Sequence, residues 1–505
     1  MSLNPTNKAF ITCHLLTTQY PTESKFICVY DPGSSADPSH SRSRRVLPWK
    51  NKDMDLIHSH QVIPYTRPRT ISALPHELLA QVFLFCKAMS PPIYEIEGRE
   101  LHAEEIISHV SSLWRSIAIG LSALWATIHV DRRVTRARVL RYLERSRSHP
   151  LIISLELYGV DTSAMCKVIA PHSHHIQHFQ AESDMWTDML TLGTFFGELS
   201  APLLEYLSIV SPFEGPSRDN RSERPTMPMF SGGAPSLKRA QFAGMGVKFR
   251  WPSPATIKTL HLHELDARPI CYSRFTGTLL GMASLVSLTI SDSIISAWSE
   301  DDTAISIPTL KSLRIIGHGR FFTNAGEILI SISAPSLECL SLVGDSQHGE
   351  INLEPLLDEQ DDSDENLRFP ALHSLTCIGV TFGIDDYVSL ATAFPTVTRL
   401  ALSQLSPKSL LDALGSYEPD EDMEILWPHL HTLTIFPTAP DNQRLRTMIS
   451  NRRKAKVPLQ RLRLRSSVLS RLNEKDWVSA RVVLEGLTNQ WMDDWDEHCS
   501  GTDVL

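Results

Sequence analysis

The chain has 505 residues but no apolar run close to the about 18 residues that cross a bilayer, so we expect no membrane partner. It also lacks a glycine-rich phosphate loop. Gly244 and Gly246 form an isolated pair, as do Gly317 and Gly319, without the further glycine or the Lys-Ser of such loops. No Gly-x-Ser-x-Gly or His-Glu-x-x-His segment occurs. These absences predict a protein that is not an enzyme and needs no cofactor.

Cysteine is scarce and scattered. The eight cysteines lie at positions 13, 28, 86, 166, 271, 339, 377 and 499, and no two form the CxxC pair of a zinc module. The first residues have neither the basic start nor the sustained apolar stretch of a secretory signal. We therefore expect reduced thiols and a cytoplasmic or nuclear protein, or one found in both compartments.

Basic residues are outnumbered, with 48 Lys and Arg against 57 Asp and Glu, and the net charge of -9 disfavours binding to nucleic acid. Two stretches depart from the average. Residues 350–365 carry eight acidic side chains and no basic one, and without the central glycine of a calcium loop they predict a solvated loop. Residues 444–465 carry nine basic side chains. These could bind an acidic partner or nucleic acid, pair with the acidic loop, or remain solvated.

Four histidines, His172, His174, His175 and His178, lie close together in the sequence and suggest a metal site. No local cysteine or carboxylate completes a set of ligands. We therefore favour a polar turn from which Ile176 and Phe179 enter the core.

Residues 1–69 show no helical or alternating period, and we predict that they are disordered. The pattern changes at Ile71, where an amphipathic helix with Pro75 in its first turn is followed by a second helical pattern and a third apolar cluster. The second pattern contains Ile106, Val110, Trp114 and Ile117, and the third contains Leu121, Leu124, Trp125 and Ile128. We interpret residues 70–130 as a compact helical module and residues 131–150 as a linker helix.

A module of about 60 residues buries only about 60% of its chain surface and is marginal alone. Its apolar stripes therefore either pack on each other or form an interface with a partner, and the sequence leaves both open.

The order and spacing of three segments in this module resemble the F-box, in particular the F-box-like proteins numerous in mushroom-forming fungi. The segments are Leu74-Pro75-x-Glu77-Leu78-Leu79-x-x-Val82-Phe83, Val110-x-x-x-Trp114-Arg115-x-Ile117-Ala118 and Leu124-Trp125-x-x-Ile128. The family often has cysteine where this chain has Ser111, and proline where it has Ala123. The resemblance implies docking on a Skp1-like adaptor protein of a ubiquitin ligase. It also implies that ten residues either contact this adaptor protein or pack within the module: Leu74, Pro75, Leu78, Leu79, Val82, Phe83, Trp114, Ile117, Leu124 and Trp125.

The rest of the chain repeats one pattern, Pro-x-Leu-x-x-Leu-x-Leu, at intervals of about 28 residues. The first apolar residue of each copy lies at 204, 237, 257, 285, 310, 337, 372, 397, 430 and 459. The pattern resembles leucine-rich repeats, in which each Leu-x-Leu forms a parallel strand with its leucines inward. The fold class that we predict is therefore an α/β repeat, with a small F-box-like helical module followed by an irregular leucine-rich-repeat solenoid over residues 151–475.

Residues 476–505 contain Trp477, Val483, Leu487 and Trp491 near helical spacing, which predicts a helix that caps the repeats or a docking helix.

Taken together, the resemblances imply a substrate-recognition adaptor of a Skp1-cullin-F-box ubiquitin ligase, with the repeats binding a protein substrate that the sequence does not identify. The alternative is a non-catalytic interaction scaffold that keeps the F-box-like shape without assembling a ligase. A nucleic-acid-associated protein that uses residues 444–465 is a weaker third hypothesis.

Overall fold

In the computed structural model, the chain divides into two compact units, Met1–Pro68 and Arg69–Leu505. The described residues all belong to the second unit, and the segment for which we predicted disorder lies outside them. The described residues are 71, 74–89, 94–96, 99–211, 227–243, 249–250, 254–263, 272–295, 304–317, 321–322, 325–344, 350–351, 368–380, 382–404, 408–415, 425–437, 441–466 and 482–487.

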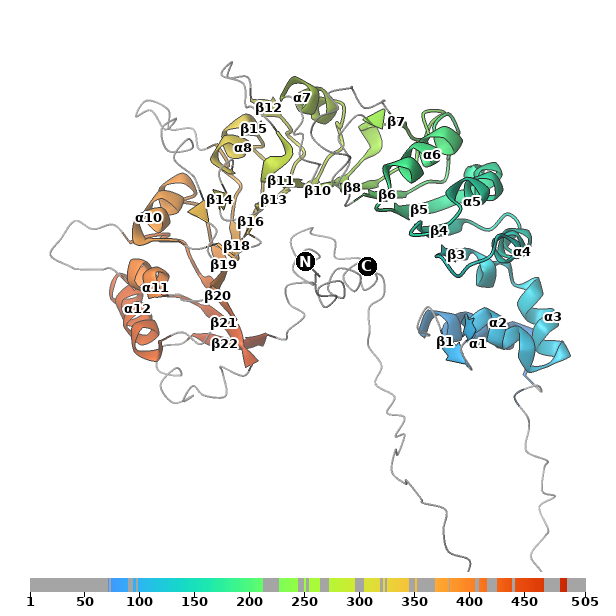
Figure 1. The fold of residues 1–505 in the computed structure, drawn as a ribbon. Coiled ribbons are helices and arrows are strands. Elements are labelled where there is room, and N and C mark those ends of the chain that lie inside the picture. The colour runs from blue at the N-terminus through green and yellow to red at the C-terminus, as the bar shows by residue number, and fades with distance from the viewer. Residues whose placement is uncertain are drawn as a thin grey trace, which may run out of the picture. The chain divides into compact units, whose positions relative to one another are not determined.

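The second unit has an α/β fold built on one 14-stranded sheet (Figure 1). The strands follow one another across the sheet in the order in which they occur along the chain. Each strand after the first pairs in parallel with the one before it. The strands are β3 (Thr127–Val130), β4 (Leu151–Glu156), β5 (Ile176–Glu182), β6 (Tyr206–Val210), β8 (Arg239–Ala243), β10 (Thr259–His263), β11 (Ser287–Ser291), β13 (Ser312–Gly317), β16 (Cys339–Gly344), β18 (Ser374–Ile378), β19 (Arg399–Gln404), β20 (Thr432–Pro437), β21 (Arg461–Arg465) and β22 (Val483–Leu487).

Helices between the strands lie on one side of this sheet (Figure 1). They are α4 (Arg136–Ser146), α5 (Thr162–Ile169), α6 (Trp186–Phe196), α7 (Tyr272–Leu280), α8 (Ala325–Ser331), α10 (Ile384–Ala393), α11 (Lys408–Gly415) and α12 (Asn442–Lys454), with short 3-10 helices at η4 (Ala170–His175), η5 (Pro254–Thr256) and η6 (Asp292–Ile294). Three two-stranded parallel sheets join neighbouring connections: β7 (Met227–Pro228) with β9 (Phe249–Arg250), β12 (Ile305–Ser306) with β15 (Ile332–Ser333), and β14 (Phe321–Phe322) with β17 (Glu350–Ile351).

Several helices begin at a polar side chain that caps the free backbone N–H groups of the first turn. The Thr135 hydroxyl accepts a hydrogen bond from the Arg138 amide before α4, and the Asp161 carboxylate accepts one from Ala164 in α5. Asp441 accepts two at the start of α12. The helix boundaries therefore follow from local side chains.

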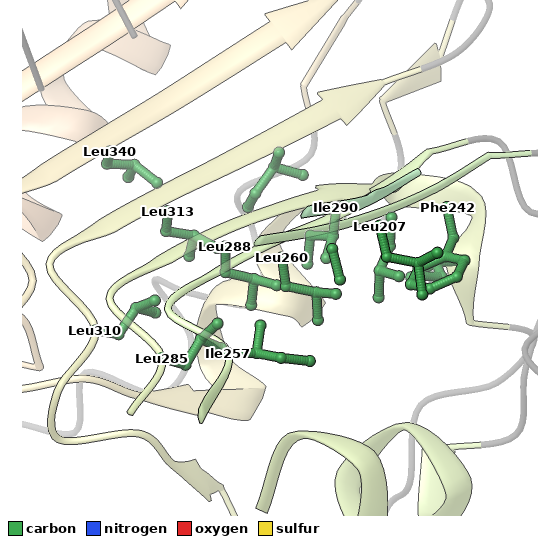
Figure 2. Close-up of a cluster of buried hydrophobic side chains, with 14 of the residues drawn as sticks. Leu207, Phe242, Ile257, Leu260, Leu285, Leu288, Ile290, Leu310, Leu313 and Leu340 are labelled. Carbon is green, nitrogen blue, oxygen red and sulfur yellow. The ribbon is translucent and has the colours of Figure 1, made fainter. Parts of the chain in front are cut away.

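The register of the strands aligns the repeated leucines. Leu260 pairs with Leu288, Leu288 with Leu313, and Leu313 with Leu340. Figure 2 shows these side chains on the same side of their strands, with Ile257, Leu285 and Leu310 in a second row before the strands. The ten first apolar positions, which are all buried, are Leu204, Leu237, Ile257, Leu285, Leu310, Leu337, Leu372, Val397, Leu430 and Leu459. The prediction of parallel strands with inward leucines is confirmed.

Each repeat buries at least three apolar side chains, and each such burial contributes about 1.5–3 kcal/mol. The segment that connects one strand to the next, which contains an α-helix in some repeats and a 3-10 turn or a short strand in others, lies on the same side of the sheet as these side chains. Because the area that this segment leaves uncovered is covered by the next strand, the repeats are stable as a stack rather than singly.

The structure differs from the prediction at both ends of the sheet. Thr127–Val130, which we assigned to the helical module, forms the first strand β3 and pairs with β4. Val483–Leu487, for which we predicted a helix, forms the strand β22 and pairs with β21. The helix prediction was wrong there, because the β-branched run that includes Val482 and Val483 extends along the open edge of β21. Trp477 and Trp491 lie outside the described residues.

A buried arginine fixes the last helix to the sheet. Arg452 of α12 is fully buried and donates to the backbone oxygens of Leu426 at 2.9 Å and Trp427 at 2.8 Å. The Trp427 indole is also buried and donates to the Phe394 carbonyl at 3.0 Å. Burial lowers the pKa of Arg452 to about 10, so its guanidinium stays charged at neutral pH. Its two donors therefore tie α12 to the segment before β20, where the Trp427 carbonyl also accepts from the Leu430 amide at 3.0 Å.

We expect Arg452→Ala to lower the free energy of unfolding by about 2–4 kcal/mol, because it removes two hydrogen bonds from a charged donor to backbone carbonyl groups and opens a cavity. Chemical denaturation of the full chain measures this change. Lys454→Ala removes an exposed charge from the same helix and should change stability by less than about 0.5 kcal/mol. Equal effects of the two substitutions would contradict the structural role of Arg452.

Candidate partner-binding surfaces

The N-terminal helical region precedes the sheet. It comprises α1 (His76–Met89), the hairpin of β1 (Tyr94–Ile96) and β2 (Arg99–Leu101), α2 (Ala103–Val110), α3 (Ser112–Gly120) and the 3-10 turn η3 (Ser122–Trp125). The second helical pattern of the sequence is broken in two at Ser111. The Ser111 side chain accepts a hydrogen bond from the Trp114 amide at 3.1 Å, and this cap starts a new helix.

One side of α1 is buried. Leu79 and Phe83 are fully covered, and the Phe83 ring lies 4.8 Å from that of Trp114 on α3. Lys87 continues this side, and its ammonium group donates to the backbone oxygen of Leu124. The three residues follow one another at intervals of four, so they share one face of the helix.

The opposite side of α1 is apolar and exposed. Leu78, Phe85 and Met89 have exposed fractions of 47%, 66% and 69%, and Leu74 is exposed immediately before the helix. Intervals of seven and four place Leu78, Phe85 and Met89 on one face. We call these four residues the exposed α1 stripe. The helix α1 is therefore apolar on two sides, and the core covers only one of them. The other side exposes apolar surface that a partner protein could cover.

The structure separates the ten residues that the F-box resemblance indicated. Three are exposed, namely Leu74, Pro75 and Leu78, and three are partly buried, namely Val82, Trp114 and Ile117. Four are buried, namely Leu79, Phe83, Leu124 and Trp125. The buried residues hold the region together, and the exposed ones are available for contact.

The ten residues did not include Phe85 and Met89, nor Val110 at the end of α2, which the sequence analysis named only as part of a pattern and which is 57% exposed. The signal for Phe85 and Met89 was present, since they lie seven and eleven residues after Leu78. It was hidden because the neighbouring Leu79 and Phe83 form an equally good stripe.

Trp125 joins the helical region to the sheet. Its indole is fully buried and donates to the Ala118 carbonyl at 2.7 Å. The Tyr142 ring of α4 meets the indole edge-on at 5.1 Å, and the Arg145 guanidinium lies 4.3 Å from its centroid. Leu79, Phe83 and Trp125 belong to the same hydrophobic cluster as the strands. The helical region and the start of the sheet therefore share one core.

Ion pairs reinforce this junction. Arg138 of α4 contacts Glu105 of α2 at 2.6 Å, and Lys87 of α1 lies 3.9 Å from the buried Glu104. Burial lowers the pKa of Lys87, and the nearby Glu104 charge opposes this shift. Lys87 also donates to the backbone of η3, and the Tyr142 ring of α4 contacts Trp125 of the same turn, so both α1 and α4 are fixed to η3.

His172, His174 and His175 lie in the turn η4, as we favoured, whereas His178 lies on the strand β5. His174 and His175 have ring nitrogens 3.2 Å apart, and Ile176 and Phe179 are buried as predicted. Burial, with the charges of His174 and His172, lowers the pKa of His175 to about 4. Across the part of the chain that the structure describes, no three His, Cys, Asp or Glu side chains are grouped to hold a metal ion.

Much of the basic stretch 444–465 is engaged within the protein. Arg444 pairs with Asp412 and Asp441, and Arg463 pairs with Glu485 at 2.6 Å. Arg452 is buried, as shown above. These partners differ from the acidic loop, of which only Glu350 and Ile351 are described. The observed pairing weakens the case for a nucleic-acid surface at this stretch.

The face of the sheet opposite the helices, which we call the polar face, carries the alternate side chains of the strands. Across neighbouring strands these side chains form rows, and one row runs from Gln241 through His261 and Thr289 to Arg314. Burial lowers the pKa of His261 to about 4, and the charges of Arg314 and Arg239 add to the shift. His261 is therefore neutral at neutral pH and lies between two arginines.

No described helix is long and apolar enough to cross a membrane. No known family model matches the chain, and no curated protein matches it.

We expect the two sides of α1 to respond differently to substitution. Leu79→Ala should lower the free energy of unfolding by about 2–5 kcal/mol, because it opens a cavity in the core. Leu78→Ala, its neighbour on the exposed α1 stripe, should change it by less than about 1 kcal/mol. Denaturant titration of the full chain compares them. A large loss of stability in Leu78→Ala would show that the stripe is a packing surface.

We expect stability to fall as the pH drops from about 6.5 to about 4. His175 and His261 stay neutral in the folded protein over this range, whereas the unfolded chain binds protons there. Thermal melting across this range should show a smaller decrease for His261→Gln than for the wild type. His149→Gln, at an exposed histidine on the α4 to β4 connection, should leave the decrease unchanged.

Proposed function

We propose that the protein is a substrate-recognition adaptor of a Skp1-cullin-F-box type ubiquitin ligase. In this proposal, the N-terminal helical region is an F-box-like module whose exposed α1 stripe docks on a Skp1-like protein. The parallel repeats form an irregular leucine-rich-repeat solenoid that binds a protein substrate. Both steps take place in the cytoplasm or the nucleus.

The exposed α1 stripe carries this proposal. It contains the Leu-Pro-x-x-Leu start of the F-box-like segment, and its leucines, Leu74 and Leu78, are exposed. Phe85 and Met89 extend the stripe with two large apolar side chains. Large apolar side chains grouped on one helix face are typical of a protein interface, where their burial supplies the free energy of binding.

The shared core at Trp125 supports an adaptor in particular. An adaptor works by holding a substrate at a defined place beside chemistry performed by another subunit, which raises the effective concentration of the substrate. Trp125, Lys87 and Arg138 join α1 and α2 to the first strand-helix unit without a flexible linker. No catalytic group is required of this chain.

The scaffold without ligase assembly remains the alternative, because a partner other than a Skp1-like protein could also cover the exposed α1 stripe. Binding to the Skp1-like protein distinguishes the two.

The experiment is co-expression of the full chain with the Skp1-like protein of the source organism, followed by size-exclusion chromatography. We expect co-elution at one to one. Leu78→Asp combined with Phe85→Asp should abolish it, because two carboxylates would enter an apolar interface at a cost of several kcal/mol.

Val388→Asp is the matched control, because Val388 is 44% exposed on a helix of the sheet, α10, away from the stripe. It should keep co-elution. Thermal melting must show all variants folded. A wild type that elutes alone, or a double variant that still co-elutes, would contradict the proposal and favour the scaffold.

A further inference from the structure

The strands of the polar face have an uneven charge. None of the strands from β6 to β21 in the main sheet contains an aspartate or glutamate, and carboxylates occur only in the strands at its two ends. At the first end, Glu156 and Glu182 contact His129 and Tyr158, and at the other end Glu485 contacts Arg463. The strands between carry only basic charges: Arg239, Arg314, Arg399, Arg461, Arg463 and Arg465.

Two pairs of arginines stand out within this surface. Arg399 and Arg461 flank Thr432 in one row of the sheet, two strands apart, which is about 10 Å. Arg239 lies on β8 and Arg314 on β13, on either side of His261. Each pair acts on a histidine. Arg314 and Arg239 lower the pKa of His261, and Arg399 and Arg461 lower that of His431 after the larger effect of burial.

Two of these guanidinium groups are available. Arg239 and Arg399 are exposed, and neither forms an ion pair with a residue in the described part of the chain. By contrast, the lysines at the neighbouring strand starts are paired where a carboxylate is near, as in Lys238 with Glu205 at 3.1 Å and Lys311 with Glu338 at 2.8 Å. Arg239 and Arg399 thus lack the local compensation that these lysines have, whereas Arg461 lies 3.9 Å and Arg463 2.6 Å from the Glu485 carboxylate.

We propose that the polar face between β8 and β21 binds an extended anionic peptide segment of the substrate protein, with one group of anions at Arg239 and Arg314 and a second at Arg399 and Arg461. This inference rests on the proposed function, because only an adaptor would make the bound peptide part of a substrate. It adds the chemical class of that substrate.

The geometry sets the length of the segment. From β8 to β21 the sheet has eight strand spacings, or about 38 Å, which an extended chain of about 12 residues spans. Guanidinium groups favour carboxylate or phosphate because their planar donors form paired hydrogen bonds with two oxygens. Arg314 shares its row with Thr289, Ser341 and Thr376, whose side chains are small and buried.

The test uses the full chain and four fluorescent probes at physiological salt. These are a 12-residue glutamate-rich peptide, the same peptide with phosphoserine at two glutamate positions, the same peptide with glutamine throughout, and a 12-nucleotide single-stranded DNA. Fluorescence anisotropy should show binding of one or both anionic peptides. The glutamine peptide, which carries no negative side chains, should bind more weakly. The first two probes separate carboxylate from phosphate as the preferred anion.

Arg239→Ala combined with Arg399→Ala should weaken peptide binding at least about tenfold, since each removes charge-assisted hydrogen bonds. Arg141→Ala combined with Lys408→Ala removes the same charge from exposed positions on α4 and α11 and should leave affinity within about twofold. Unchanged affinity in the first double variant would overturn the proposal. Tighter binding of DNA than of either anionic peptide, lost in the same variant, would reassign the surface to nucleic acid and overturn it too.

The two proposals fail separately. The double variant of Arg239 and Arg399 should still co-elute with the Skp1-like protein, and the double variant of Leu78 and Phe85 should still bind the peptide. If the wild type does not bind the peptides but still co-elutes with the Skp1-like protein, only the proposal of an anionic substrate is overturned. If the wild type binds a peptide but does not co-elute, the polar face is still a binding surface and the proposal of a ligase adaptor is overturned.

Discussion

The stacking of leucine rows across parallel strands is the interaction on which the rest of the structure depends. A single strand with its helix leaves much of its apolar face uncovered, and only the next unit covers it. Leu260, Leu288, Leu313 and Leu340 therefore lie in register across four consecutive strands of the sheet. The same requirement continues at the N-terminal end, where Trp125 and Leu79 extend the core into the helices that precede β3. Once the inward positions are committed to the core, the alternate positions lie on the polar face, and this is why arginines that are far apart in the sequence share one face of the sheet.

Short-range pattern was sufficient to predict most of the sheet. The spacing of Leu310, Leu313 and Ile315 defines a turn, a strand and its inward side chains within a few residues, so the sequence indicated it directly. The ends of the sheet were different. Thr127–Val130 and Val483–Leu487 form strands because each pairs with the edge of a neighbouring strand. That neighbour lies elsewhere in the sequence, so the local pattern of residues does not reveal it.

The candidate surfaces show the same limit. On α1, Leu78 and Leu79 are adjacent and chemically alike, and only the packing of α3 against Phe83 decides that Leu79 is buried and Leu78 exposed. In the basic stretch, Arg452 and Arg453 are also adjacent and alike, yet Arg452 is in the core because the carbonyls of Leu426 and Trp427 face it. Composition and periodicity describe what a residue can do, whereas its role depends on partners contributed from elsewhere in the chain.

The sequential order of the strands has a consequence for folding. Because each strand of the sheet pairs with those nearest to it along the chain, most stabilising contacts close short loops, and the entropy lost in forming each contact is small for a chain of this length. Structure can then spread from any nucleus by adding one unit at a time, and unfolding can begin at an end. The two ends are unequal in this respect. At β3 the helices α1 to α3 extend the core, whereas within the described residues no element covers the outer edge of β22, so we expect fraying to start at the C-terminal end of the sheet.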